Sequence, residues 1–83
     1  MNMSKAYEVG TIRKFKVPYS MESEGRVFYE NEIYEAHYKE GWQGVQEGGA
    51  LTVSFFAENG YFNFTDELFE RVIKGWDLVE VES

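Results

Sequence analysis

Cysteine is absent from this 83-residue chain, and proline and histidine each occur once. Without cysteine, neither disulfides nor thiolate metal sites can hold the fold together, which fits a reducing compartment. A catalytic triad needs a base that orients a nucleophile. The single histidine, His37, lies in an expected strand and has no serine beside it in the sequence. We therefore expect a protein that is not an enzyme and has no cofactor.

Long apolar runs are also missing. No segment approaches the ~20 consecutive apolar residues of a membrane-spanning helix, and residues 1–8 lack the apolar stretch of a secretory signal. Seven phenylalanines, six tyrosines and two tryptophans supply the core instead, because each buried ring removes about 150–250 Å² from water. We expect one cytoplasmic domain over residues 1–83, since chains divide into domains only well above this length.

Charge is unevenly distributed along the chain. Residues 22–83 contain fourteen acidic and four basic residues, a charge of −10, whereas residues 1–21 carry +3, and the whole chain carries −7. The acidic residues lack the alternating Asp/Asn ladder and glycine of a calcium loop, so we expect no metal site. A domain this small also offers no cleft in which paired carboxylates would enclose a sugar.

The basic residues near the start of the chain form a candidate patch for binding nucleic acid. Arg13, Lys14 and Lys16 would be its cations. The acidic remainder of the chain repels phosphates within a Debye length of ~8–10 Å, which argues against direct binding of nucleic acid. We expect these three cations to pair with acidic strands, within one chain or across a dimer interface.

The clearest local pattern lies in residues 51–64, where apolar residues alternate on both sides of Asn59-Gly60. Asn-Gly is the preferred centre of a two-residue type I′ hairpin turn, because both central positions need a positive φ. Centred there, the turn pairs Phe55 with Phe64. It gathers the apolar side chains of both strands on one face.

A short helix is expected after the hairpin. Thr65 is a suitable N-cap, and Gly75 suits a left-handed C-cap. Apolar residues recur between them at helical spacing; they are Leu68, Phe69, Val72, Ile73 and Trp76. Residues 76–81 then alternate apolar and acidic side chains, which predicts a final strand.

The first half of the chain is less regular. It predicts a strand over residues 7–17, a polar loop over 19–25, an extended piece over 26–29, a strand over 33–38 and a glycine-rich loop over 40–50. This element order resembles that of Src-homology-3-like (SH3-like) barrels, although the Ala-Leu-Tyr-Asp-Tyr signature of their peptide-binding members is absent. We expect an α+β, mostly β fold: a small SH3-like barrel or a strongly bent antiparallel sheet of about five strands, with one short helix before the last strand.

Several acidic residues lie in or beside expected strands and form the candidate binding surface, namely Glu30, Glu32, Glu35, Asp77, Glu80 and Glu82. Side chains two residues apart in a strand lie ~6.6–6.8 Å apart, and neighbouring strands are ~4.8 Å apart. Two adjacent acidic strands would therefore approach the charge density of a DNA strand, whose phosphates recur every ~3.4 Å. Tyrosine is enriched in interfaces, so Tyr29, Tyr34 and Tyr38 are the expected anchors.

A small, cysteine-free, strongly acidic and β-rich chain with surplus tyrosines resembles the bacteriophage host-takeover and anti-defence proteins that mimic DNA. The resemblance lies in size, charge and composition and includes no motif. It implies an inhibitor that occupies the nucleic-acid-binding surface of a basic host protein, such as a histone-like nucleoid protein or a nuclease. The alternative is a general protein–protein interaction module or structural small barrel, able to form a homodimer, whose acidity serves only solubility.

Overall fold

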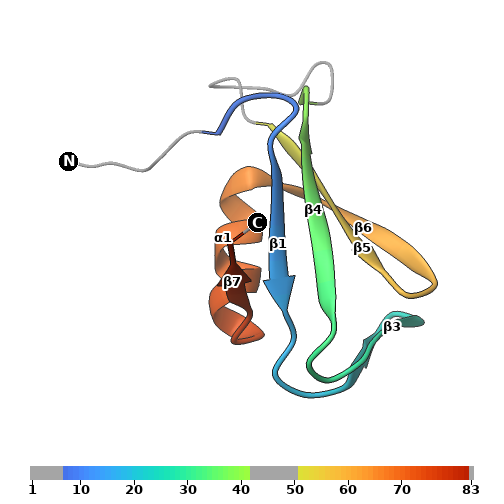
Figure 1. Cartoon of the computed structure of the whole chain (residues 1–83). Helices are drawn as coiled ribbons and strands as arrows, with labels where there is room; N and C mark the ends of the chain where they lie inside the picture. Colours follow the sequence, from blue (N-terminus) through green and yellow to red (C-terminus); the bar gives the residue numbers. More distant parts are fainter. Residues whose placement is uncertain (1–6, 42–50, 83) are drawn as a thin grey trace.

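The computed structural model describes residues 7–41 and 51–82, which form seven strands and one helix. In chain order these are β1 (Ile12–Lys16), β2 (Met21–Ser23), β3 (Arg26–Phe28), β4 (Ile33–Lys39), β5 (Thr52–Ala57), β6 (Gly60–Thr65), α1 (Asp66–Gly75) and β7 (Val79–Val81). Five strands form one sheet in the order β6-β5-β4-β1-β7, and β2 pairs with β3 in a separate hairpin. In Figure 1, α1 lies beside β7, and β3 lies below the tip of the β5–β6 hairpin.

The α+β, mostly β fold with a short helix before the last strand is confirmed, in its open-sheet form. All strand pairs of the sheet are antiparallel. Within the described residues, β6 and β7 pair with one neighbour each and remain the two edges, so the barrel is not closed. The helix connects the two edges in sequence and packs on one face of the sheet, where its Phe69 contacts Phe15 and Phe55.

Aromatic rings fill the core between the sheet and α1. Phe15, Phe28, Phe55 and Phe69 are completely buried. The rings of Phe28 and Phe55 stack with centroids 5.3 Å apart, and those of Phe15 and Phe69 meet edge to face at 5.5 Å. The expected helical stripe is wrong for Leu68, which is 41% exposed. It is confirmed for its other members, since Phe69 is buried and Val72, Ile73 and Trp76 pack against the core.

The β5–β6 hairpin forms with a register different from the expected one. Phe55 faces Phe62 rather than Phe64, and the two-residue loop is Glu58-Asn59. Because the shift moves each partner by two residues, the same side chains stay on the same faces. The two consecutive positive φ angles of a type I′ turn, expected at this loop, occur instead in the loop between β2 and β3.

The loop between β2 and β3 carries two consecutive positive φ angles, 50° at Glu24 and 82° at Gly25. Strand β2 and this turn lie within the polar loop expected over residues 19–25, whereas β3 confirms the extended piece expected over residues 26–29. Asn59 is engaged with it: its Oδ1 accepts from the Val27 N–H, and its Nδ2 donates to the Gly25 carbonyl, both at 2.8 Å. The Glu58 N–H also donates to the Val27 carbonyl at 2.9 Å. The tip of the β5–β6 hairpin therefore holds the β2–β3 hairpin in place.

The helix begins and ends with defined caps. Thr65 is the N-cap, as predicted, and its Oγ1 accepts from the Leu68 N–H at 3.1 Å. At the other end, the Asp77 N–H donates to the Lys74 carbonyl and the Leu78 N–H to the Ile73 carbonyl, a Schellman motif. Asp77, with φ 57°, occupies the left-handed position that the sequence assigned to Gly75.

The remaining differences concern the ends of elements. The first strand begins at Ile12 rather than at residue 7, because Gly10 turns the chain with φ 97°. The glycine-rich loop expected over residues 40–50 lies, from residue 42 on, outside the described residues. Among the residues that are described, no helix is long and apolar enough to span a membrane.

Replacing Asp77 by glycine should stabilise the fold by about 0.5–1 kcal/mol. A left-handed conformation costs about 1–2 kcal/mol for a residue with a Cβ, and the greater freedom of glycine in the unfolded chain offsets about 0.5–1 kcal/mol of this gain. The melting temperature followed by circular dichroism should rise by about 2–8 °C. Asp77→Ala removes the same carboxylate but keeps the Cβ, so it should bring no gain. An equal gain from both variants would attribute the effect to charge instead.

Candidate binding surfaces

The predicted acidic residues do not form one surface. Glu30 and Glu32 lie in the turn between β3 and β4, Glu35 lies on β4, and Asp77, Glu80 and Glu82 lie on or beside β7. Strand β1 separates β4 from β7, and its Lys14 faces Glu35 on one side and Val81 on the other. The expected pair of adjacent acidic strands is therefore wrong, because a basic strand lies between them.

Two of the three predicted tyrosine anchors are not on the surface. Tyr34 is 7% exposed and Tyr38 2% exposed, whereas Tyr29 is half-exposed. The Tyr34 hydroxyl accepts from the Tyr29 N–H at 2.7 Å and donates to Glu58 Oε2 at 2.8 Å. Burial raises the pKa of Tyr34, and the Glu58 carboxylate adds to this effect. These two rings are core and positioning groups, so their assignment as anchors is corrected.

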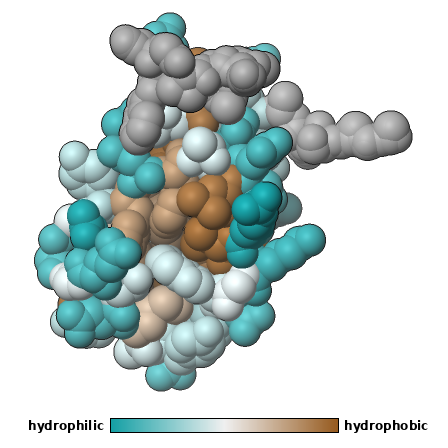
Figure 2. Space-filling model, turned by 180° about the vertical axis from the view of Figure 1, so that it is seen from behind, coloured by the Kyte–Doolittle hydropathy of each residue, from teal (hydrophilic) through white to brown (hydrophobic). Residues whose placement is uncertain are grey.

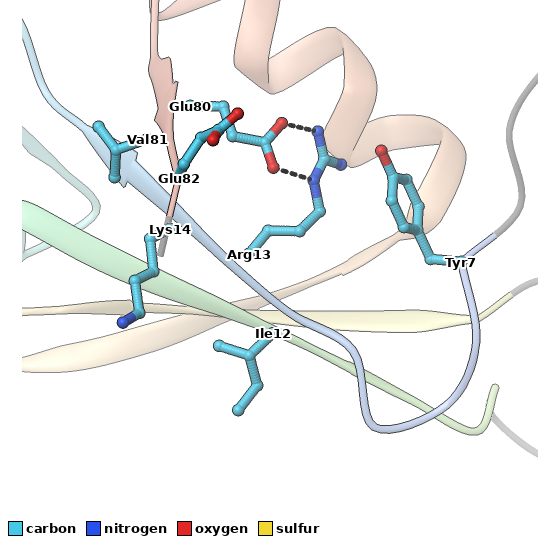
Figure 3. Close-up of a pocket in the computed structure, with 7 residues that line it drawn as sticks. All are labelled: Tyr7, Ile12, Arg13, Lys14, Glu80, Val81 and Glu82. Atoms are coloured by element: carbon cyan, nitrogen blue, oxygen red, sulfur yellow. Dashed lines mark hydrogen bonds and ion pairs between the residues drawn. The ribbon is translucent and has the colours of Figure 1, made fainter.

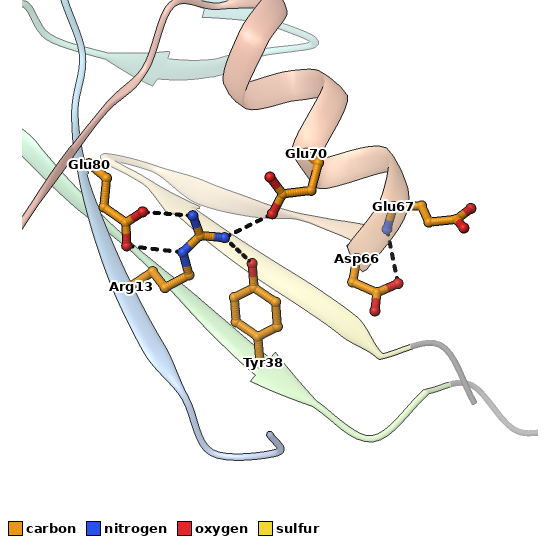
Figure 4. A network of polar contacts seen from close by, with 6 residues as sticks. All are labelled: Arg13, Tyr38, Asp66, Glu67, Glu70 and Glu80. Carbon is orange, nitrogen blue, oxygen red and sulfur yellow. Dashed lines mark hydrogen bonds and ion pairs between the residues drawn. The ribbon is translucent and has the colours of Figure 1, made fainter. Parts of the chain in front are cut away.

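Arg13 is a buried cation at the centre of a polar network (Figure 4). Its side chain is 9% exposed, and its Nε and Nη2 donate to both carboxylate oxygens of Glu80 at 3.0 and 2.7 Å. Its Nη1 donates to the Tyr38 hydroxyl at 2.7 Å and to Glu70 Oε2 at 2.9 Å. The network therefore joins β1, β4, α1 and β7.

Burial and hydrogen bonding act in opposite directions on this network. Burial lowers the pKa of Arg13, but its bonds to Glu80, Tyr38 and Glu70 raise it more, so the guanidinium stays charged. Burial raises the pKa of Tyr38 to about 12, although Arg13 opposes the shift. The guanidinium also lies 4.4 Å from the ring centroid of Tyr7 and 5.0 Å from that of Phe15. Contacts of this kind are worth about 0.5–1 kcal/mol at exposed sites and about 2 kcal/mol when desolvated.

An open pocket of about 600 Å³ lies beside this network (Figure 3), lined by Tyr7, Ile12, Arg13, Lys14, Glu80, Val81 and Glu82. The guanidinium and the Glu80 carboxylate at its wall already bind each other, so neither charge is free for a ligand. Over the part of the chain that the structure describes, no group of three His, Asp or Glu residues is placed to hold a metal ion.

The basic residues of β1 were expected to pair with acidic strands within one chain or across a dimer interface, and Arg13 pairs within the chain. Within residues 7–41 and 51–82, Lys14 and Lys16 form no ion pair. Both point to the sheet face opposite α1, where Lys14 faces Glu35 across the ladder. The sequence did hold a signal for Arg13: it alternates with Phe15 and Val17, so all three share the inward face.

One end of the molecule does concentrate acidic residues. We call it the acidic end; it comprises the β2–β3 hairpin, the β3–β4 turn and the β5–β6 tip, and its carboxylates are Glu22, Glu24, Glu30, Glu32 and Glu58. Its single base, Arg26, donates to the carbonyls of Tyr61 and Glu24 at 2.8 and 2.9 Å. The acidic end therefore carries a net charge of −4.

Exposed tyrosines accompany these carboxylates. Tyr19, Tyr29 and Tyr61 are each about half-exposed and lie in or next to the acidic end. Sequence reasoning identified Glu30, Glu32 and Tyr29 of this set. It did not place the others beside them, because the β2–β3 hairpin and its contact with the β5–β6 tip were not recognised.

Glu80→Gln should lower the free energy of unfolding by about 1–2 kcal/mol, because it removes the charge that neutralises a buried guanidinium. The expected loss is no larger because the Glu80 side chain is 46% exposed, so water screens part of its interaction with Arg13. Urea unfolding measures the loss. Glu82→Gln removes an exposed carboxylate from the same strand end and should stay within about 0.5 kcal/mol. Equal losses in the two variants would contradict the assigned network.

Tyr38 should make the fold sensitive to alkaline pH. Its pKa is about 12 in the fold against an ordinary 10, so between these values the unfolded chain binds fewer protons. The contribution of Tyr38 to stability is then fully present below pH 10. Above pH 10 the free energy of unfolding falls by up to about 1.4 kcal/mol per pH unit. Urea unfolding of Tyr38→Phe should show a shallower decline. Tyr61→Phe, which removes an exposed hydroxyl, should keep the steeper one; a decline unchanged by Tyr38→Phe would refute the assignment.

Similarity to known proteins adds no further constraint on these surfaces. Comparison of the chain with protein-family models, with curated proteins and with solved structures finds no match. The chemistry of the surfaces themselves therefore carries the functional interpretation.

Proposed function

We propose that this chain is a non-enzymatic binding protein that occupies a basic, nucleic-acid-binding surface of a partner protein, with the acidic end as its contact surface. The observation that carries the proposal is the charge of −4 gathered with three exposed tyrosines at one end. A histone-like nucleoid protein and a nuclease are the candidate partners. The resemblance to phage DNA mimics supplies these two names.

The electrostatics of the acidic end favour such a partner. Opposite potentials attract over a distance comparable to the Debye length, raise the association rate and make binding sensitive to salt. Arg26 is the single cation of this end, and its donors already bind main-chain carbonyls. The carboxylates around it therefore remain available to cations of another protein.

The acidic end is also held in a fixed shape. Asn59 binds two main-chain groups of the β2–β3 hairpin, and Tyr34 joins Glu58 to the Tyr29 main chain. A surface that is ordered before binding loses less conformational entropy in the complex. Tyr29, half-exposed on this scaffold, offers the amphipathic ring that commonly anchors an interface.

Displacement of DNA tests the proposal directly. A purified histone-like nucleoid protein, bound to a fluorescent DNA duplex, is titrated with the chain while fluorescence anisotropy reports free duplex. The chain should release the duplex, and release should weaken as salt rises from about 50 to 300 mM. The combined variant Glu30→Gln, Glu32→Gln should need about tenfold more protein, a change worth about 1.4 kcal/mol.

A matched variant separates the acidic end from total charge. Glu67→Gln with Glu82→Gln removes two exposed carboxylates from α1 and the β7 end, so its net charge equals that of the first variant. It should change the required concentration less than about twofold. If both variants weaken release equally, or if release does not depend on salt, the contact is not the acidic end. Failure to release duplex from either a nucleoid protein or a nuclease would leave solubility as the role of the acidity.

A further inference from the structure

Strand β6 forms one edge of the sheet, and among the described residues Arg26 covers its start by donating to the Tyr61 carbonyl and lying 4.6 Å from the ring centroid of Phe62. Natural edge strands are commonly short, charged, bulged or interrupted by proline, because their free main-chain groups attract other strands. The opposite edge, β7, is three residues long and contains Glu80. Strand β6 has six residues, Gly60–Thr65, and its sequence GYFNFT contains no charged residue and no proline.

The register shows which main-chain groups of β6 face outward. The Asp66 N–H donates to the Leu51 carbonyl, and bonded and non-bonded pairs alternate along an antiparallel ladder. The main-chain N–H and C=O groups of Phe62 and Phe64 therefore bond to β5. Those of Tyr61, Asn63 and Thr65 point to the open edge. The bond from Arg26 Nε to the Tyr61 carbonyl agrees with this direction.

Apolar side chains flank this edge on the helix side. Phe62 and Phe64 on β6, with Val72 and Trp76 of the helical segment, are only partly buried, and Leu68 is 41% exposed. Figure 2 shows the apolar surface in the centre of this face, with hydrophilic residues around it. A strand added at β6 would cover part of this surface as well as the free main-chain groups.

We propose that β6 pairs antiparallel with β6 of a second copy of this chain, around a two-fold axis at Asn63. In this register Tyr61 faces Thr65 of the second copy, and Phe62 faces Phe64, so that two aromatic cross-strand pairs form. The exchanged hydrogen bonds come from the outward groups of Tyr61, Asn63 and Thr65. The Tyr61 carbonyl, which already accepts from Arg26 Nε, would accept from the Thr65 N–H of the second copy with its other lone pair. The strand is thus complementary to itself in both main-chain and side-chain terms.

Charge selects this edge for self-association. Each copy carries −7, so two copies repel over most of their surfaces. Pairing at β6 brings no carboxylate opposite another, whereas pairing at β7 would bring Glu80 and Glu82 of both copies together. Arg26 beside Tyr61 would also approach the start of α1 in the second copy, where Asp66 and Glu67 lie.

Sedimentation velocity over a wide range of protein concentration tests the dimer. The unsubstituted chain should sediment as a dimer that dissociates on dilution. Asn63→Lys places two ammonium groups opposite each other at the two-fold axis. It should raise the dissociation constant at least about tenfold, which corresponds to about 1.4 kcal/mol.

Two variants control for side effects of this substitution. Asn63→Thr loses the same 2.6 Å bond to Ser54 but adds no charge, and it should keep the dimer. Val79→Lys adds the same charge at an exposed position of β7, and it should keep the dimer too. Equal dimerisation of the Asn63→Lys and Asn63→Thr variants, or equal weakening by Val79→Lys, would overturn the proposal.

Amide hydrogen exchange gives a test that needs no variant. The N–H groups of Tyr61, Asn63 and Thr65 should become more protected as protein concentration rises, because the described part of a single chain offers them no strand partner. If Asn63→Lys fails to fold by circular dichroism, this measurement decides. A chain that stays monomeric at every concentration, or amides whose protection does not change, would refute the pairing.

Discussion

The fold depends on the burial of one cation. The guanidinium of Arg13 lies between the sheet and the helix, where removing a charge from water costs several kcal/mol unless partners replace the lost hydration. Glu80, Glu70 and Tyr38 supply those partners from three other elements. Each element must lie in one position for the network to form. An open sheet, whose edges β6 and β7 do not bond to each other within the described residues, is thereby fixed in one shape.

Local chemistry made much of this fold predictable. The N-cap at Thr65, the alternation in residues 33–38 and the apolar pattern of residues 51–64 depend on neighbours within a few positions, and each produced the expected element. The hairpin register did not follow, because Asn59 binds Gly25 and Val27. These residues lie more than thirty positions away, and no short pattern reveals them.

The candidate surface was predictable only in part for the same reason. The surface that strand residues share depends on which strands become neighbours. Because β1 lies between β4 and β7, the carboxylates of these two strands do not form the continuous acidic surface that was expected. Tyr34 and Tyr38 share a face with Ala36, so their own alternation indicated burial more strongly than an interface. Glu30, Glu32 and Tyr29 were found because a turn exposes its residues whatever the strand order.

The pairing of β1 with β7 has a consequence for the order in which the chain folds. Arg13 and Glu80 are 67 residues apart, and closing a loop of this length costs more chain entropy than forming the β2–β3 or β5–β6 hairpin. Arg13 must therefore remain hydrated until α1 and β7 arrive together. Release of its water then coincides with the closing of the sheet, which makes the docking of these two elements a late and cooperative step.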